Sequence, residues 1–92
     1  MFYVIVYDIT DDKRRKKVAD LLEGYGARVQ YSVFECVLNK GQYRQLKNCL
    51  IKCINLEEDS IRIYPIVKNT LHKVENWGKG KNLTKPLGSI II

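Results

Sequence analysis

The sequence predicts an α+β fold, a βαββαβ sandwich with both helices on one face of a sheet and an additional C-terminal strand. Two observations support this prediction. Strand-like runs alternate with two amphipathic stretches, so a strand–helix unit occurs twice in succession. The 92 residues suffice for one compact core but not for two. We expect one domain over residues 1–92, with a core of about residues 1–67 and an extension of about residues 68–92.

The first strand covers residues 2–7, which are apolar on both alternating faces and rich in β-branched and aromatic side chains. That pattern is typical of a central strand covered on both sides. Asp8 ends the strand, and Thr10, Asp11 and Asp12 offer acceptors for the first turn of a helix. Apolar residues and two terminating glycines then mark this helix: Val18, Leu21, Leu22 and Tyr25, with Gly24 and Gly26.

Residues 28–38 alternate in the manner of a strand, with one set of apolar side chains on each face. The run is long for a single strand, and no glycine or asparagine marks a turn within it. It is therefore either one bent strand or a tight hairpin that turns near Ser32.

Residues 39–41 break this strand, and a second amphipathic helix is predicted over residues 42–54. Residues 60–67 return to a strand, in which Pro65 indicates a position near a sheet edge or a strand end. The apolar residues of the second helix are Tyr43, Leu46, Leu50, Ile51 and Ile54.

The last 25 residues carry five lysines against one glutamate, and residues 77–81 read as a flexible basic loop. The chain then ends in an apolar run, residues 89–92 (Ser-Ile-Ile-Ile). Left on a monomer, this run would be an aggregation-prone edge. We therefore expect it to form an additional strand that pairs with a sheet edge, in particular that of a partner protomer.

Composition and charge argue against a membrane-spanning protein and favour a polyanionic partner. No apolar run approaches the roughly 20 residues of a membrane span, and the N-terminus resembles a strand rather than a signal peptide. We expect a cytoplasmic protein, in which the odd number of cysteines (Cys36, Cys49 and Cys53) fits reduced thiols with packing roles. The net charge of +6 indicates binding to nucleic acid, the commonest cytosolic polyanion.

The first turns of the predicted first helix carry five consecutive cations: Lys13, Arg14, Arg15, Lys16 and Lys17. The helix dipole favours anions at this end, so helix energetics do not explain them. A cationic cluster beside the unpaired N–H groups of a helix N-terminus suits phosphate binding. The alternative is a solvated face that Asp11, Asp12 and Asp20 partly neutralise.

Asp8 lies at the carboxyl end of the predicted central strand, where α/β proteins place ligand-binding groups. It can equally be a turn residue that accepts nearby amide N–H groups. A single carboxylate holds Mg²⁺ weakly, because the ion needs several oxygen ligands. Two copies of Asp8 that meet across a twofold axis would form a better site.

Two segments resemble the CRISPR-associated protein two family, the small partner of the CRISPR integrase. They are residues 7–12 (Tyr-Asp-Ile-Thr-Asp-Asp), with the basic helix that follows, and residues 28–35 (Arg-Val-Gln-Tyr-Ser-Val-Phe-Glu). The resemblance covers about the first 67 residues. It implies a ferredoxin-like fold, a homodimer and a part in acquiring new spacers. Members of the family have been described as metal-dependent endoribonucleases, and some as deoxyribonucleases.

The resemblance also implies roles for individual residues. Asp8 faces its symmetry mate and holds a divalent metal, Mg²⁺ or Mn²⁺. Tyr7, Arg15, Arg28 and Phe34 join Asp8 as the catalytic set, and Lys17 stands where relatives often have arginine. Together with the charge pattern, it gives these nucleic-acid-binding residues: Lys13, Arg14, Arg15, Lys16, Lys17, Arg28, Lys79 and Lys81.

Two functions therefore stay open. The protein is either a metal-dependent endonuclease, acting chiefly on RNA, in which Arg15 and Arg28 neutralise transition-state charge, or a non-catalytic scaffold. The scaffold would track the backbone of duplex DNA for the integrase without reading bases. Duplex DNA and single-stranded RNA are both expected ligands. An RNA-recognition module is disfavoured, because Glu23 has the wrong charge for its motif and Ala27 replaces a stacking aromatic residue.

Overall fold

The computed structural model describes residues 1–80 and 82–85. Within them the elements follow in this order: β1 (Phe2–Asp8), α1 (Asp12–Glu23), β2 (Ala27–Gln30), β3 (Val33–Val37), α2 (Lys40–Cys53), β4 (Ser60–Ile66) and α3 (Lys68–Leu71). This is the βαββαβ order followed by a short helix, and it confirms the predicted α+β fold. The predicted additional strand near the C-terminus lies outside the described residues.

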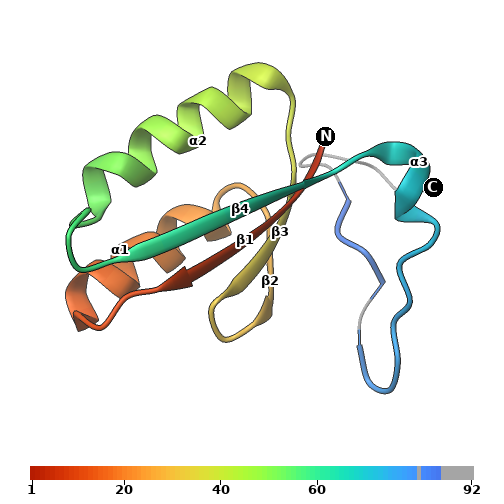
Figure 1. Ribbon diagram of the computed structural model, residues 1–92, viewed down its shortest axis with the longest axis horizontal. Helices are drawn as coiled ribbons and strands as arrows, with labels where there is room; N and C mark the ends of the chain where they lie inside the picture. Colours follow the sequence, from red (N-terminus) through yellow and green to blue (C-terminus); the bar gives the residue numbers. More distant parts are fainter. Residues whose placement is uncertain (81, 86–92) are drawn as a thin grey trace.

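The four strands form one antiparallel sheet in the order β2-β3-β1-β4. β1 is hydrogen-bonded to a neighbour on each edge, whereas β4 lies at the edge of the sheet within the described chain, as Pro65 indicated. Figure 1 shows α1 and α2 side by side on the same face of this sheet. The sheet order and the helix placement are those of a ferredoxin-like sandwich.

Capping residues decide where both long helices begin. The side chain of Asp11 accepts a hydrogen bond from the backbone N–H of Arg14 at 2.9 Å, and α1 starts at Asp12. α2 starts at Lys40, two residues earlier than predicted, because Asn39 and Gln42 form a capping box. Asn39, which was expected to break the preceding strand, is thus the N-cap of α2.

No helix among the described residues is long and apolar enough to cross a membrane.

Residues 28–38 form a tight hairpin rather than one bent strand, so the second of the two alternatives is correct. β2 and β3 pair antiparallel on either side of a turn at residues 31–32. The pairing contains an irregularity between Arg28 and Gln30. The turn is attached to the central strand, since the backbone N–H of Tyr7 donates to the carbonyl of Ser32 at 3.1 Å.

The core lies between the sheet and the two long helices. Helix α1 contributes Val18, Ala19 and Leu22, while the sheet contributes the odd-numbered residues of β1 with their neighbours on β3. Ile51 is 60% exposed, so its predicted core position is wrong: the buried face of α2 is centred on Leu46 and Leu50. The fully buried large side chains are Phe34, Ile5, Leu22, Leu38, Leu46, Val18 and Cys36.

The other face of the sheet carries the even-numbered residues of β1. Val4 and Val6 on this face are only half-buried, and Tyr64, which is paired with Val4 across the β1–β4 ladder, is 45% exposed. Phe2, at the start of this series, is only 4% exposed, so the prediction that β1 is covered on both sides is wrong only for the part of the strand that carries Val4 and Val6. The helices cover one face and leave opposite it a largely apolar open face, which also carries Glu35 and Arg62.

Gly26, between α1 and β2, gives the first prediction. A Cβ atom here would overlap the carbonyl oxygen of Glu35 and lie 2.6 Å from the Sγ atom of Cys36. We expect Gly26→Ala to lower the free energy of unfolding by about 1–3 kcal/mol, measured by urea denaturation. Gly41→Ala is the matched control, because the nearest atom to its Cβ is 3.5 Å away, and it should change stability little or raise it. Equal stability of the two variants would contradict this account.

Candidate functional site

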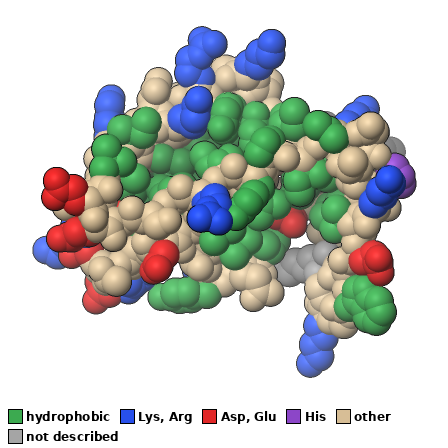
Figure 2. All heavy atoms as spheres, in the orientation of Figure 1, with side chains coloured by type: hydrophobic (Ala, Val, Ile, Leu, Met, Phe, Trp, Pro, Cys, Tyr) green, Lys and Arg blue, Asp and Glu red, His purple; other side chains and the backbone are tan. Residues whose placement is uncertain are grey.

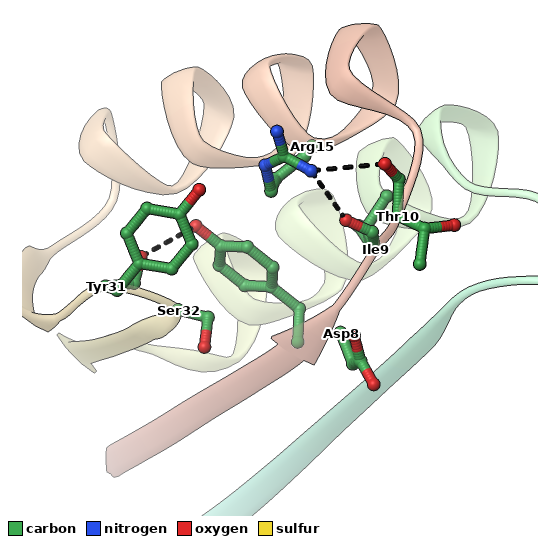
Figure 3. A pocket seen from close by; sticks show the side chains of 7 residues that line it. Asp8, Ile9, Thr10, Arg15, Tyr31 and Ser32 are labelled. Carbon is green, nitrogen blue, oxygen red and sulfur yellow. Dashed lines mark hydrogen bonds between the residues drawn. The ribbon is translucent and has the colours of Figure 1, made fainter.

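Asp8 ends β1 with an exposed carboxylate on the open face of the sheet. Its position is fixed by antiparallel pairing with Ser60 of β4. In Figure 3 its side chain points away from Arg15 and Tyr31. Within the described chain this side chain has no hydrogen bond and no ion pair. Two alternatives were given for Asp8. A carboxylate that is free to bind a ligand fits these contacts better than a turn residue whose side chain accepts amide N–H groups.

A surface hollow of about 430 Å³ lies beside the end of β1 and is lined partly by Tyr7, Asp8, Arg15 and Tyr31. Tyr7 is only 4% exposed, and its hydroxyl donates a long hydrogen bond of 3.4 Å to the carbonyl of Tyr31. Burial raises the pKa of Tyr7 above its ordinary value of 10.0, although Arg28 nearby opposes the shift. Tyr7 is therefore a neutral hydrogen-bond donor at physiological pH and not a phenolate.

Arg15 holds the loop between β1 and α1. Its Nη1 atom donates to the carbonyls of Ile9 and Thr10 at 3.1 and 3.2 Å, and its Nη2 atom is paired with the carboxylate of Asp12 (Figure 3 shows the two carbonyl bonds). The guanidinium therefore faces the hollow with part of its charge already neutralised. These bonds fix the chain immediately after Asp8.

Arg28 and Phe34 form a second unit on the helix side of the sheet. The guanidinium of Arg28 lies 5.2 Å from the centre of the Phe34 ring, and an ion pair of 3.6 Å joins it to Glu23. Phe34 is fully buried, so any contribution it makes to catalysis must act through the placement of Arg28 or Tyr7. A hollow of about 380 Å³ is shared by Tyr7, Arg15 and Arg28.

The structure thus brings together Tyr7, Arg15, Arg28 and Phe34 but places the side chain of Asp8 on the opposite side of β1. The cause is the two-residue period of a strand, which turns consecutive side chains to opposite faces. Asp8 meets the others only at the end of the strand, where the hollow opens. The five predicted catalytic residues do not converge on a single point within one chain.

Ion pairs engage three of the five cations at the start of α1. Arg14 pairs with Asp59 and Glu58, Arg15 with Asp12, and Lys16 with Asp20 at 2.9 Å. Lys13 and Lys17 are exposed and form no ion pair within the described residues. The alternative of a partly neutralised face therefore describes part of this cluster. Its predicted phosphate binding stays a prediction.

Arg14 makes the most extensive of these contacts. Its Nε and Nη2 atoms donate to the two oxygens of the Asp59 carboxylate at 2.8 and 3.2 Å, and Nη2 also donates to Glu58 at 3.0 Å. The side chain of Asp59 is inaccessible to solvent and accepts a further bond from the backbone N–H of Asn55 at 2.8 Å. The Arg14 hydrogen bonds first, and then the Asn55 bond, hold the pKa of Asp59 below its ordinary value of 3.8.

Helix α2 carries a cationic surface that was not predicted from the sequence. This helix carries Lys40, Arg44, Lys47 and Lys52 and contains no acidic residue. None of the four forms an ion pair with any described residue, although the ammonium of Lys47 lies 4.7 Å from the centre of the Tyr43 ring. Figure 2 shows Lys and Arg side chains along the upper edge of the molecule, over α2. The signal was present in the sequence as four cations in 14 residues without a counter-charge.

The basic C-terminal region is only partly described. Lys79 is exposed beside Trp77, whose side chain is 82% exposed, and both line a groove of about 630 Å³ together with Arg28. Thr84 donates from its backbone N–H and its hydroxyl to the carboxylate of Glu35, at 3.2 and 3.0 Å, which brings this segment back to β3. Lys81, also predicted to bind nucleic acid, lies outside the described residues.

Asp8 has the chemistry of one metal ligand but not of a complete site. Its carboxylate is an exposed hard oxygen donor, the type that Mg²⁺ and Mn²⁺ prefer. No group of three or more His, Cys, Asp or Glu side chains among the described residues could hold a metal ion. Within the described residues, Asp8 is therefore a single carboxylate ligand.

Comparison with known proteins gives a consistent result. The model of the family "CRISPR associated protein Cas2" matches residues 1–74. A Synechocystis protein named "CRISPR-associated endoribonuclease Cas2 3" is 59% identical over 98% of this chain and 97% of its own length. The crystal structure of Streptococcus pyogenes Cas2 superposes with a TM-score of 0.74 at 37% identity, covering 85% of this chain and all of that one. A chain of a partial Cas6-RT-Cas1–Cas2 complex has a TM-score of 0.73 at 35% identity, over 97% of this chain and 98% of that one.

The contacts of Asp59 predict an acid-sensitive contribution to stability. Because the folded-state pKa of Asp59 lies below 3.8, its ionised form is favoured by folding, and this contribution is complete above about pH 3.8. It is lost as the pH falls through the lowered pKa. Urea unfolding of the wild type and Asp59→Asn between pH 7 and pH 3 should show a wild-type advantage that shrinks at the acid end. An advantage that stays constant to pH 3 would count against the ionised pair.

Proposed function

Since the chain belongs to the CRISPR associated protein Cas2 family, we propose that it is a subunit for CRISPR adaptation that binds nucleic-acid backbone and cleaves RNA as a metal-dependent endonuclease. The observation that carries this proposal is Asp8, an exposed carboxylate with no partner at the end of the central strand. Relatives that are named endoribonucleases support this activity, and the Cas1–Cas2 complex that contains a similar chain supports the integrase as a partner.

The proposed active form is a homodimer in which two copies of Asp8 share one Mg²⁺ or Mn²⁺. Two facing carboxylates repel unless a cation or a proton lies between them, and the ion needs more oxygen ligands than one chain offers. The open face of the sheet, with Val4, Val6 and Tyr64, supports an apolar dimer contact on the side that carries Asp8.

In the proposed reaction the chain's own residues bind and orient the phosphate. Arg15 lines the hollow beside Asp8 and also the neighbouring hollow that it shares with Arg28, and both cations stabilise negative charge that develops on the phosphate oxygens. Tyr7 remains protonated and supplies a neutral donor or positions Tyr31. A divalent ion, when bound, supplies Lewis-acid polarisation of the phosphate.

A second function, an architectural scaffold for duplex DNA, is favoured by α2. Lys40, Arg44 and Lys47 are exposed cations without acidic partners in the described chain, which suits contact with a phosphate backbone and not the reading of bases. Lys13, Lys17 and Lys79 extend this charge. Scaffold and nuclease use different residues, so one protein can serve as both.

The proposal places the protein in the cytoplasm with reduced cysteines. Cys36, Cys49 and Cys53 are all free. Burial raises the pKa of the Cys36 thiol to about 11, so this residue acts as a packing group and not as a reactive thiolate.

The proposal predicts that cleavage depends on Asp8. Purified wild type and Asp8→Asn are assayed on single-stranded RNA and duplex DNA, with and without Mn²⁺. RNA cleavage by the wild type should require the ion, and Asp8→Asn should lose roughly 100-fold or more of it. Backbone binding should persist, because Asp8 does not touch the cationic helix faces.

Glu57→Gln is the matched control, since it also removes one exposed carboxylate that has no side-chain partner in the described chain, and it should cleave like the wild type. Absence of cleavage in every protein, with intact duplex binding, would favour the scaffold. Equal cleavage by wild type and Asp8→Asn would refute the catalytic part of Asp8.

A further inference from the structure

Arg14 lies in the run of five cations but is bound differently from its neighbours. Its side chain is 26% exposed, against 77% for Lys16, and three hydrogen bonds join it to the Asp59 and Glu58 carboxylates. The two bonds to Asp59 form a bidentate contact, which holds the planar guanidinium in one orientation. These bonds connect the first turn of α1 to a loop 45 residues further along the chain.

The Asp59 carboxylate is fixed independently of Arg14. The backbone N–H of Asp59 donates to the carbonyl of Asn55 at 2.8 Å, and the N–H of Asn55 donates back to the Asp59 carboxylate. The side chain of Asn55 accepts from Glu57 at 2.9 Å, so the loop is folded around these bonds. Arg14 therefore docks on a preformed acceptor that solvent does not reach.

The two segments that Arg14 joins flank Asp8. One is the start of α1, where Asp11 caps the helix through the backbone N–H of Arg14 itself. The other ends at Asp59, directly before Ser60, and Ser60 is the partner of Asp8 in the β1–β4 pairing. Any movement of α1 relative to β4 must therefore displace the loop that follows Asp8 and connects β1 to α1.

We propose that Arg14 is a positioning residue for Asp8 and not a phosphate ligand. By holding Asp59 against α1, it fixes the distance between the start of the helix and the strand that pairs with Asp8. Arg15 fixes the same loop from inside, through the carbonyls of Ile9 and Thr10. This inference rests on the proposed function in one respect, that Asp8 is the metal-binding residue.

The alternative, in which Arg14 grips phosphate, requires it to leave the Asp59 carboxylate. Departure would break the bidentate contact and the bond to Glu58 together, and would uncover an Asp59 side chain that solvent does not reach while Arg14 is in place. Lys13 and Lys17 are exposed and have no such competitor in the described chain. They are the better phosphate contacts in this segment.

The two roles of Arg14 predict opposite behaviour for Asp59→Asn. If Arg14 is a phosphate ligand held back by Asp59, removal of the Asp59 charge should tighten binding to duplex DNA, while Arg14→Gln should weaken it. If Arg14 positions Asp8, both variants should cause the same defect, and the double variant Arg14→Gln/Asp59→Asn should be no worse than either. The double variant removes both charges of the Arg14–Asp59 pair and leaves only the exposed Glu58 without its partner, so it keeps the test valid if a single variant unfolds.

The experiment measures Mn²⁺ affinity by electron paramagnetic resonance and the slope of log K against log salt for duplex DNA, using the full chain. We expect Arg14→Gln, Asp59→Asn and the double variant to weaken Mn²⁺ binding by about 10-fold or more and to leave the salt slope unchanged. The control Lys13→Gln should retain the wild-type Mn²⁺ affinity and lower the slope by about 1. A lowered slope in Arg14→Gln, or wild-type Mn²⁺ affinity in all three folded variants, would overturn the proposal.

Amide hydrogen exchange separates this inference from the proposed function. Arg14→Gln should increase exchange at residues 59–61 as well as at residues 9–12, and Asp59→Asn should do the same in both segments. That result is expected even if the wild type binds no Mn²⁺, an outcome that would refute only the metal at Asp8. Exchange that changes in the mutated segment alone would show that the ion pair does not hold the two together.

Discussion

The pairing of β1 along both of its edges is the constraint on which the rest of the molecule depends. Because β3 and β4 hydrogen-bond to it from either side, the strand cannot slip in register, and its residues alternate strictly between two environments. Tyr3, Ile5 and Tyr7 enter the core under the helices, whereas Asp8 ends the opposite series. The exposed carboxylate at the end of a buried strand is thus a direct result of register.

The charges of the two helices are arranged differently, although both helices are basic. At the start of α1, acidic residues engage Arg14, Arg15 and Lys16. Arg14 and Arg15 also bind the loops before β4 and after β1, whereas Lys16 pairs with Asp20 of the same helix. On α2 the cations have no acidic partner in the described chain and remain available to a polyanion. Net charge predicted a polyanionic partner, and the ion pairs show which basic surface has no acidic partner of its own within the described residues.

Local patterns were enough to predict the fold. Hydrophobic periodicity predicted the strands and both long helices, Gly24 and Gly26 predicted the end of α1, and Pro65 indicated the edge strand. The remaining features depend on contacts between distant residues. Arg14 and Asp59 lie 45 positions apart, so a cation in a basic run could not be distinguished from one buried against a carboxylate. Ile51 was misplaced because the buried face of α2 is centred on Leu46 and Leu50, which turns the next residue outward.

The central claim is that the carboxylate at the end of β1 makes a metal site only when two chains meet. One chain supplies a single exposed Asp8, and the described residues contain no cluster that could complete the coordination. The number of ions bound per chain tests this claim most directly. Titration of Mn²⁺ into the full chain, with free ion followed by electron paramagnetic resonance, should saturate at one ion per two chains. Saturation at one ion per chain, independent of protein concentration, would contradict the account.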